Sequence, residues 1–311
     1  MNSINKNINK LRLEIPILII AFNRPKLTKK LLKSIELLKP SKIYVAADGP
    51  RNNNINDLDS CNYTRKLFET EINWECELKK KFRPSNVGVK KNINEALDWF
   101  FTDEEMGIII EDDCEVNQSF FKFCEELLIK YKINNKIKAI SGNYYFTNSL
   151  KNSYYFSRCP GTHGWATWKR AWQENDIEMK RWSPFADFIW LLFYFKFDIV
   201  KAHYFYKKFS HSYESKINSW DYQFLYSIWK SNGLIIRPFK SLSKHIGWGD
   251  DATHSKGVDR HPDVQLRDMK FPIEHPKDFK INSKLDNLEI KITRNVRFVN
   301  YILYKIKNKF L

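Results

Sequence analysis

Along residues 15–143, short apolar runs alternate with stretches in which apolar residues recur every three or four positions. This pattern predicts strands separated by helices. Residues 15–21 and 42–48 are almost continuously apolar, as buried strands of a parallel sheet are. Between them, Leu27, Leu31, Ile35 and Leu38 recur every three or four positions, which is the period of a helix. Pro25 suits the first turn of that helix, because its missing N–H would be unpaired there in any case.

The same alternation continues beyond the first strand and helix. It predicts helices over residues 57–70, 87–101 and 118–132, and strands over residues 75–82, 107–110 and 137–141. Strands that alternate with helices favour a mixed, mainly parallel sheet flanked by helices. The predicted fold class is therefore α/β and Rossmann-like.

The chain after residue 150 is rich in Trp, Tyr and His, and its strand patterns are short. No Pro- or Gly-rich linker separates the two halves, so we predict one domain over residues 15–283, with halves 15–150 and 151–283. Residues 1–14 form a polar extension before it. Residues 284–311 place apolar side chains at helical spacing among many Lys and Arg, which predicts a basic amphipathic C-terminal helix. Such a helix either lies on an anionic membrane surface or packs on the domain.

Composition narrows the function classes only partly. The 311 residues include 52 Lys and Arg against 36 Asp and Glu, a formal charge of +16 that suits nucleic acid, an anionic membrane or an anionic substrate. The excess is spread along the whole chain. Five cysteines without CxxC spacing argue against a zinc ribbon or a disulfide framework. Because no apolar run is long enough to span a bilayer and the N-terminus is polar, we expect a cytoplasmic protein, either free or peripheral on the inner face of the membrane.

Three consecutive carboxylates, Glu111, Asp112 and Asp113, end the predicted strand at residues 107–110. Adjacent carboxylates at a strand end repel one another and lose solvation, so a cation is expected to compensate them. Mg²⁺ and Mn²⁺ take oxygen ligands and commonly bridge one or two carboxylates to substrate phosphates. An acidic turn that caps the next helix is the alternative. Asp48 and Arg24 follow two other strands, and such strand ends meet at one edge of a doubly wound sheet.

The chain carries no GxGxxG after its first strand, no GxxxxGK[ST] and no HExxH. Residues 108–123 instead resemble the acidic metal motif of GT-A fold glycosyltransferases of the N-acetylglucosaminyltransferase I type and their bacterial family 2-like relatives. The resemblance extends, in the same order, over residues 15–260. It includes Gly164-Trp165-Ala166-Thr167-Trp168, Ser219-Trp220-Asp221 and the stretch from His245 to His254.

The resemblance implies a role for each matching residue. Asp113 would coordinate a Mn²⁺ or Mg²⁺ ion that bridges the donor diphosphate, Asp112 would contact the ribose or sugar, and Glu111 would line the sugar pocket. Asp48 would face the base or ribose, and Arg24 would reach the nucleotide. It also implies a nucleotide-diphosphate sugar as donor, with UDP-sugars expected, and a glycan or lipid-linked acceptor in bacterial surface polysaccharide assembly.

The second half supplies the remaining candidates. Asp221 matches the general base of inverting enzymes, although Tyr222 stands where the family has a second aspartate. Trp165 is expected to offer an aromatic platform to the donor sugar. His254 lies in an acidic, Gly-containing loop that could close over the donor, and it is the candidate for a further metal ligand.

The reaction places its own demands on these residues. Departure of a nucleoside diphosphate builds negative charge that a divalent ion stabilises, and inversion requires a distant carboxylate to take the acceptor proton. The sequence therefore predicts an inverting, metal-dependent glycosyltransferase. The alternatives are a sugar nucleotidyltransferase and a non-catalytic basic module that binds RNA or membranes. Clustered carboxylates repel a phosphate backbone, so we expect no nucleic-acid partner.

Overall fold

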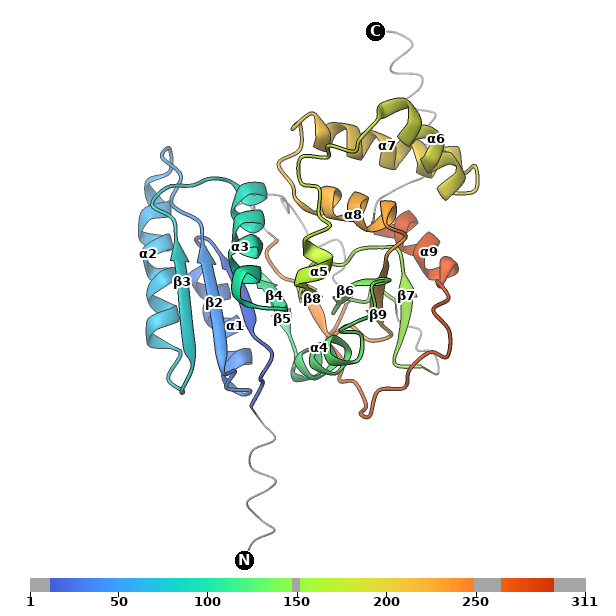
Figure 1. Cartoon of the computed structure of the whole chain (residues 1–311). Coiled ribbons are helices and arrows are strands. Elements are labelled where there is room, and N and C mark those ends of the chain that lie inside the picture. The colour runs from blue at the N-terminus through green and yellow to red at the C-terminus, as the bar shows by residue number, and fades with distance from the viewer. Residues whose placement is uncertain (1–11, 147–151, 249–263, 294–311) are drawn as a thin grey trace, which may run out of the picture.

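A computed structural model describes residues 12–146, 152–248 and 264–293 of the chain (Figure 1). An eight-stranded sheet runs through the molecule in the order β3-β2-β1-β4-β8-β6-β9-β7. Its strands are β1 (Ile17–Ala21), β2 (Lys42–Ala47), β3 (Glu77–Phe82), β4 (Met106–Glu111), β6 (Ile137–Ser141), β7 (Tyr154–Ser157), β8 (Trp165–Trp168) and β9 (Leu234–Pro238). The helices of the first half are α1 (Pro25–Glu36), α2 (Ile55–Thr70), α3 (Val89–Asp103) and α4 (Gln118–Lys130).

The sheet is mixed. Strands β3, β2, β1 and β4 are mutually parallel, and so are β6 and β9, whereas β8 runs antiparallel to both β4 and β6. Strand β7 closes the edge antiparallel to β9. The predicted mainly parallel sheet flanked by helices is confirmed, and strands from both halves of the chain belong to one sheet.

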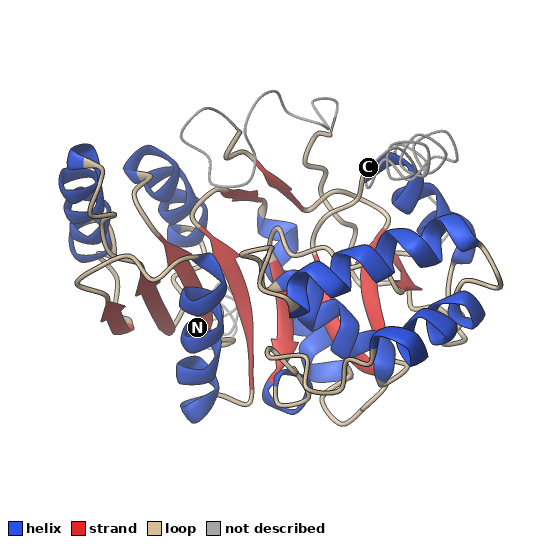
Figure 2. Cartoon of the chain, turned by 90° about the horizontal axis from the view of Figure 1, so that it is seen from above, coloured by secondary structure: helices blue, strands red, loops and turns tan. Residues whose placement is uncertain are grey.

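Two hydrophobic cores cover the two faces of the sheet. Alternate residues of β1, such as Ile17 and Ile19, point into a core shared with α1, α2 and α4. The intervening Leu18 and Ile20 point into a second core, shared with α3 and with the helices of the second half. Figure 2 shows the strands between these two groups of helices. Near-continuous apolar strands are required because both faces are buried.

The second half of the chain adds helices that the sequence pattern did not predict. These are α5 (Lys169–Trp172), α6 (Pro184–Tyr194), α7 (Ile199–Tyr213) and α8 (Asp221–Lys230). Helix α8 packs on the sheet, and the α6–α7 hairpin lies beyond it (Figure 1). Helix α9 (Ser283–Thr293) covers the start of the predicted C-terminal helix, and Ile290 packs in the second core. Residues 294–311 lie outside the described part of the chain.

Two short strands lie outside the main sheet. Strand β5 (Cys114–Val116) follows the acidic triplet directly, and it pairs antiparallel with β10 (Ser243–His245). The sequence pattern did not predict this pairing, which brings together residues as far apart in the chain as Cys114 and His245. Among the described residues, no helix is both long and apolar enough to cross a membrane.

Candidate functional site

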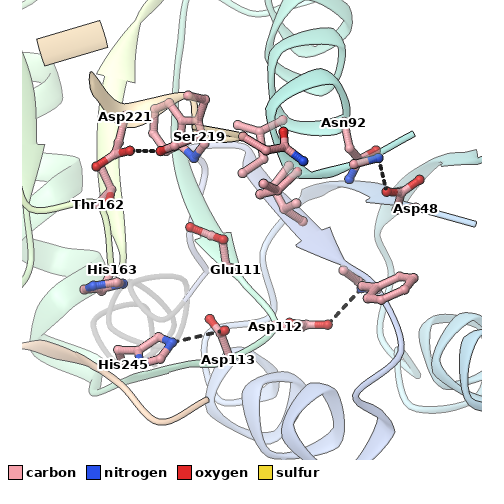
Figure 3. Close-up of a pocket in the computed structure, with 18 of the residues that line it drawn as sticks. Asp48, Asn92, Glu111, Asp112, Asp113, Thr162, His163, Ser219, Asp221 and His245 are labelled. Carbon is pink, nitrogen blue, oxygen red and sulfur yellow. Dashed lines mark hydrogen bonds and ion pairs between the residues drawn. The ribbon is translucent and has the colours of Figure 1, made fainter. Parts of the chain in front are cut away.

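A cavity of about 500 Å³ opens at the carboxyl ends of β1, β2 and β4 (Figure 3). Strand β1 has β2 on one side and β4 on the other, so successive strands diverge there and leave a crevice at the sheet edge. Residues that precede β8 and α8, in the second half of the chain, form the opposite wall of the cavity. The candidates Arg24, Asp48, Glu111, Asp112, Asp113 and Asp221 all line this cavity. The structure therefore brings together six of the eight residues singled out from the sequence.

The acidic triplet lines the cavity, and neighbouring groups fix its position. Asp112 accepts a hydrogen bond from the backbone N–H of Phe22, with 2.9 Å between N and Oδ2, so β1 fixes its direction. The Arg24 guanidinium forms an ion pair with Asp113 and lies 3.7 Å from Asp112 Oδ1. Because Arg24 immediately precedes α1, the turn that starts this helix also supplies the cation for the triplet.

His245 is the functional candidate that the sequence analysis missed. Its Nε2 lies 3.2 Å from Asp113 Oδ2, because β10 pairs with β5 and aligns His245 with Cys114. The ring of His163 lies 4.8 Å from that of His245, between centroids, and both histidines line the cavity. The sequence alone does not show that β10 pairs with β5, so it could not indicate that His245 lies near Asp113.

Burial and mutual repulsion perturb the carboxylates strongly. Burial, reinforced by the charge of Asp113, raises the pKa of Asp112 to about 7. Burial also raises the pKa of Glu111, with the charges of Asp113 and Asp112 adding to it. For Asp113 burial works in the same direction, but His245 and Arg24 outweigh it and lower the pKa of this carboxyl. The site thus keeps one carboxylate firmly ionised among neighbours that resist ionisation.

Asp221 faces this cluster from the other wall of the cavity. It is the first residue of α8, and its carboxylate accepts a hydrogen bond from the Ser219 hydroxyl. Figure 3 shows Glu111 between Asp221 and Asp113, and the charges of both raise the pKa of Glu111. A substrate in the cavity would therefore have carboxylates on two sides.

Asp48 has a structural task that the sequence did not indicate. Its Oδ1 accepts from the N–H groups of Gly49 (2.8 Å) and Val87 (3.0 Å), and its Oδ2 accepts from that of Gly88 (3.2 Å). Gly88, with φ of 84°, forms the N-terminal boundary of α3. Asp48 thus anchors the loop before α3 while still lining the cavity.

The other two candidates fall elsewhere. Trp165 does not line the cavity: it is 1% exposed and stacks on Trp220, with 5.3 Å between ring centroids. The expected contact between Trp165 and the donor sugar is therefore corrected, because Trp220 stands between this ring and the cavity. His254 lies outside the described residues.

The residues around Asp113 fit a divalent ion only with help from a substrate. Across residues 12–146, 152–248 and 264–293, no group of three or more His, Cys, Asp or Glu side chains is arranged to hold a metal. Asp113 and His245 offer one oxygen and one nitrogen within 3.2 Å of each other. Mg²⁺ in phosphate-transfer sites is held by one or two carboxylates plus substrate phosphates, so the Asp113 carboxylate matches that arrangement, whereas the His245 imidazole is a softer ligand than Mg²⁺ prefers.

Comparison with known proteins leaves the family open. Neither protein-family models nor curated proteins match the sequence. Among solved structures, 4-diphosphocytidyl-2C-methyl-D-erythritol synthase from Anaerococcus prevotii is 11% identical and has a TM-score of 0.38, with 71% of this chain and 87% of that one covered.

Two further solved structures are comparably distant. A UDP-glucose pyrophosphorylase complexed with UDP-glucose is 10% identical at a TM-score of 0.31, with 52% and 78% covered. HddC from Yersinia pseudotuberculosis is 11% identical at 0.30, with 50% and 77% covered. These neighbours are nucleotidyltransferases, and none of the three is named as a glycosyltransferase. Because their TM-scores are low, these neighbours do not assign the chain to a family.

Proposed function

We propose that the protein is an inverting glycosyltransferase that uses a nucleotide-diphosphate sugar and a divalent cation. The observation that supports the proposal is that two acidic groups with different surroundings line the same cavity. Asp113, compensated by Arg24 and His245, lies at the end of β4, and Asp221 faces it from α8. Leaving-group stabilisation and proton removal need separate positions, and this cavity offers both.

Asp113 and His245 would hold Mn²⁺ or Mg²⁺ together with the donor phosphates. The ion supplies electrostatic stabilisation of the departing diphosphate. Arg24 would then exchange part of its contact with Asp113 for a phosphate oxygen, because a guanidinium binds carboxylate and phosphate with the same geometry. Asp112, oriented by the Phe22 N–H, and Glu111 would accept hydrogen bonds from ribose or sugar hydroxyls.

Asp221 would take the proton of the acceptor hydroxyl. It is the first residue of α8, and it lines the cavity. Ser219 orients the carboxylate through its hydrogen bond. We further propose a UDP-sugar as donor and a glycan or lipid-linked acceptor, both of which rest on the sequence resemblance.

A sugar nucleotidyltransferase is the second candidate, because the pyrophosphorylase found among the solved structures belongs to that class. One local feature favours the first candidate. The turn after β1 carries a single arginine, Arg24, and no glycine between Ala21 and α1. A triphosphate is usually cradled by backbone N–H groups of a Gly-rich loop at this position.

A thermal shift series tests the binding half of the proposal. UDP, GDP and CMP are each added at millimolar concentration, with and without Mn²⁺. A ligand at 100 times its Kd stabilises by about 2.7 kcal/mol, or about 4 °C for a chain of 311 residues. We expect one diphosphate to raise the Tm only when Mn²⁺ is present.

Two matched variants complete this experiment. Asp113→Asn should lose the metal-dependent shift, and Asp59→Asn, which changes an exposed carboxylate on α2, should keep it. A shift that survives in Asp113→Asn would reject the assigned ligand. The absence of a shift with every nucleotide would reject the donor site and favour the basic binding module.

A further inference from the structure

The α6–α7 hairpin exposes an apolar stripe that no part of the described chain covers. Phe185, Ile189 and Phe193 are spaced four residues apart on α6, so they follow one line along the helix. They are 80%, 38% and 64% exposed, and Phe197 and Ile199 extend the stripe through the turn to α7 at 65% and 45%. The opposite side of α6 is anchored by the fully buried Leu191.

The stripe is concentrated rather than scattered. Within the described residues, five of the fifteen exposed large apolar side chains fall in this segment of fifteen residues. The Phe193 and Phe197 rings are in contact, with 5.0 Å between centroids. Contiguous exposed apolar surface of this kind marks an interaction site, whereas single exposed apolar residues are ordinary.

The turn of the hairpin holds its aromatic residue at an energetic cost. Lys196 and Phe197 have φ of 52° and 62°, the left-handed region that bulky residues rarely occupy. Apart from its contact with the Phe193 ring, the Phe197 side chain is 65% exposed, and Asn or Gly would fit the backbone better. Strain combined with exposure indicates that the Phe197 ring serves a contact outside the described fold.

The charged side chains near the stripe indicate what kind of surface binds to it. Each acidic side chain of the segment from α6 to the start of α7 is neutralised: Asp187 is buried and pairs with Lys230 at 2.8 Å, and Asp198 pairs with Lys201 at 2.6 Å. Lys196 lies within the stripe itself. An apolar face rich in Phe, with an exposed lysine and no uncompensated acidic side chain, suits the interface of an anionic bilayer, whereas a protein partner would not require this neutralisation.

Helix α9 lies beside the hairpin. A small cavity is lined by Tyr194 and Lys201 from the hairpin and by Asn287 and Ile290 from α9, so these elements are neighbours. The 18 residues that follow α9 contain five Lys or Arg and no Asp or Glu. These 18 residues lie outside the described part of the chain.

We propose that the α6–α7 apolar stripe docks the protein onto an anionic lipid bilayer. Phe185, Phe193 and Phe197 insert among the acyl chains near the headgroups, and Lys196 pairs with lipid phosphates. Lys208 of α7 and Ile217 line the candidate active-site cavity. Docking would therefore place the mouth of that cavity near lipid-borne molecules, a consequence that rests on the proposed function, whereas the docking itself does not.

Vesicle co-sedimentation of the full chain tests the proposal. Vesicles contain either phosphatidylcholine alone or phosphatidylcholine with phosphatidylglycerol. We expect wild type to bind the anionic vesicles, and Phe185→Ser with Phe193→Ser to weaken the partition constant about tenfold or more. Ile55→Ser with Ile133→Ser is the matched control, because these side chains are 91% and 90% exposed on other elements, and it should bind as wild type does.

Phe197→Asn separates docking from folding. Asparagine tolerates a positive φ, so this variant should unfold at the same or a higher temperature while binding vesicles more weakly. Wild-type binding by the Phe185/Phe193 variant would overturn the proposal, and so would equal binding of wild type to neutral vesicles. A dimer in solution that the same variant dissociates would also overturn it, because the stripe would then be a subunit interface. None of these outcomes depends on nucleotide binding.

Discussion

Replacing Asp112 with asparagine should stabilise the protein when no ligand or metal is present. Asp112 is 5% exposed and lies between two other carboxylates, and its pKa rises from 3.8 to about 7. That rise corresponds to at most about 4 kcal/mol of destabilisation when the residue is ionised. Asparagine carries no charge and can still accept the hydrogen bond from the Phe22 N–H.

The pH dependence follows from the sign of the shift. Below pH 3.8 the carboxyl is protonated in both the folded and the unfolded states, so it contributes nothing. Between pH 3.8 and about 7 the unfolded state releases the proton while the folded state retains it, and wild type loses stability as the pH rises. Above pH 7 both states are ionised and the penalty is constant.

The Tm difference between Asp112→Asn and wild type should therefore grow from pH 4 to pH 7 and then level off. The asparagine amide also faces Arg24, 3.7 Å from Asp112 Oδ1, which reduces the gain to about 2 kcal/mol. For 311 residues this amounts to about 3 °C. Calorimetry in EDTA across this pH range measures it, with Asp59→Asn as the control. A destabilised variant, or a difference that does not change with pH, would refute the reasoning.

Three other substitutions probe the site and its support. Asp221→Asn should leave the metal-dependent nucleotide shift intact and remove transfer, and normal turnover would reject Asp221 as the base. Gly247→Ala should weaken nucleotide binding, because the added Cβ would lie 2.6 Å from Asp113 Cβ and Oδ2; unchanged calorimetric affinity would show that the loop yields instead. Glu289→Ala leaves the fully buried Arg237 without its carboxylate at 3.0 Å and should cost about 3–5 kcal/mol in chemical denaturation. Replacing both residues with methionine should recover much of that loss, and an undiminished loss would argue against the ion pair as its cause.

Local periodicity was sufficient to predict the first half of the fold. The predicted strands at residues 42–48 and 137–141 match β2 and β6, and the predicted helix at residues 118–132 matches α4. These elements are regular: the strands appear in the sequence as short apolar runs, and the helix as apolar residues with a period of 3.6. The convergence of Arg24 and the triplet also followed, because parallel strands end at one edge of the sheet.

The remaining site residues depended on contacts between distant segments. His245 reaches Asp113 only because β10 pairs with β5, and a three-residue strand carries too little pattern to predict that pairing. Trp165 has the composition of a sugar platform, but the Trp220 ring covers it. The α6–α7 hairpin was missed because its exposed phenylalanines obscure the usual contrast between a buried and a solvated face.

The central claim is that this cavity cleaves a nucleotide-diphosphate sugar between the sugar and the diphosphate. The direct measurement is phosphorus NMR of the products formed by wild type and Asp221→Asn with Mg²⁺, which does not broaden the phosphorus signals. One set of reactions contains nucleotide sugars, with water as the acceptor of the sugar, and the other contains nucleoside triphosphates with sugar 1-phosphates. We predict release of a nucleoside diphosphate from one nucleotide sugar by wild type only. Release of pyrophosphate from a triphosphate would contradict the claim and establish a sugar nucleotidyltransferase.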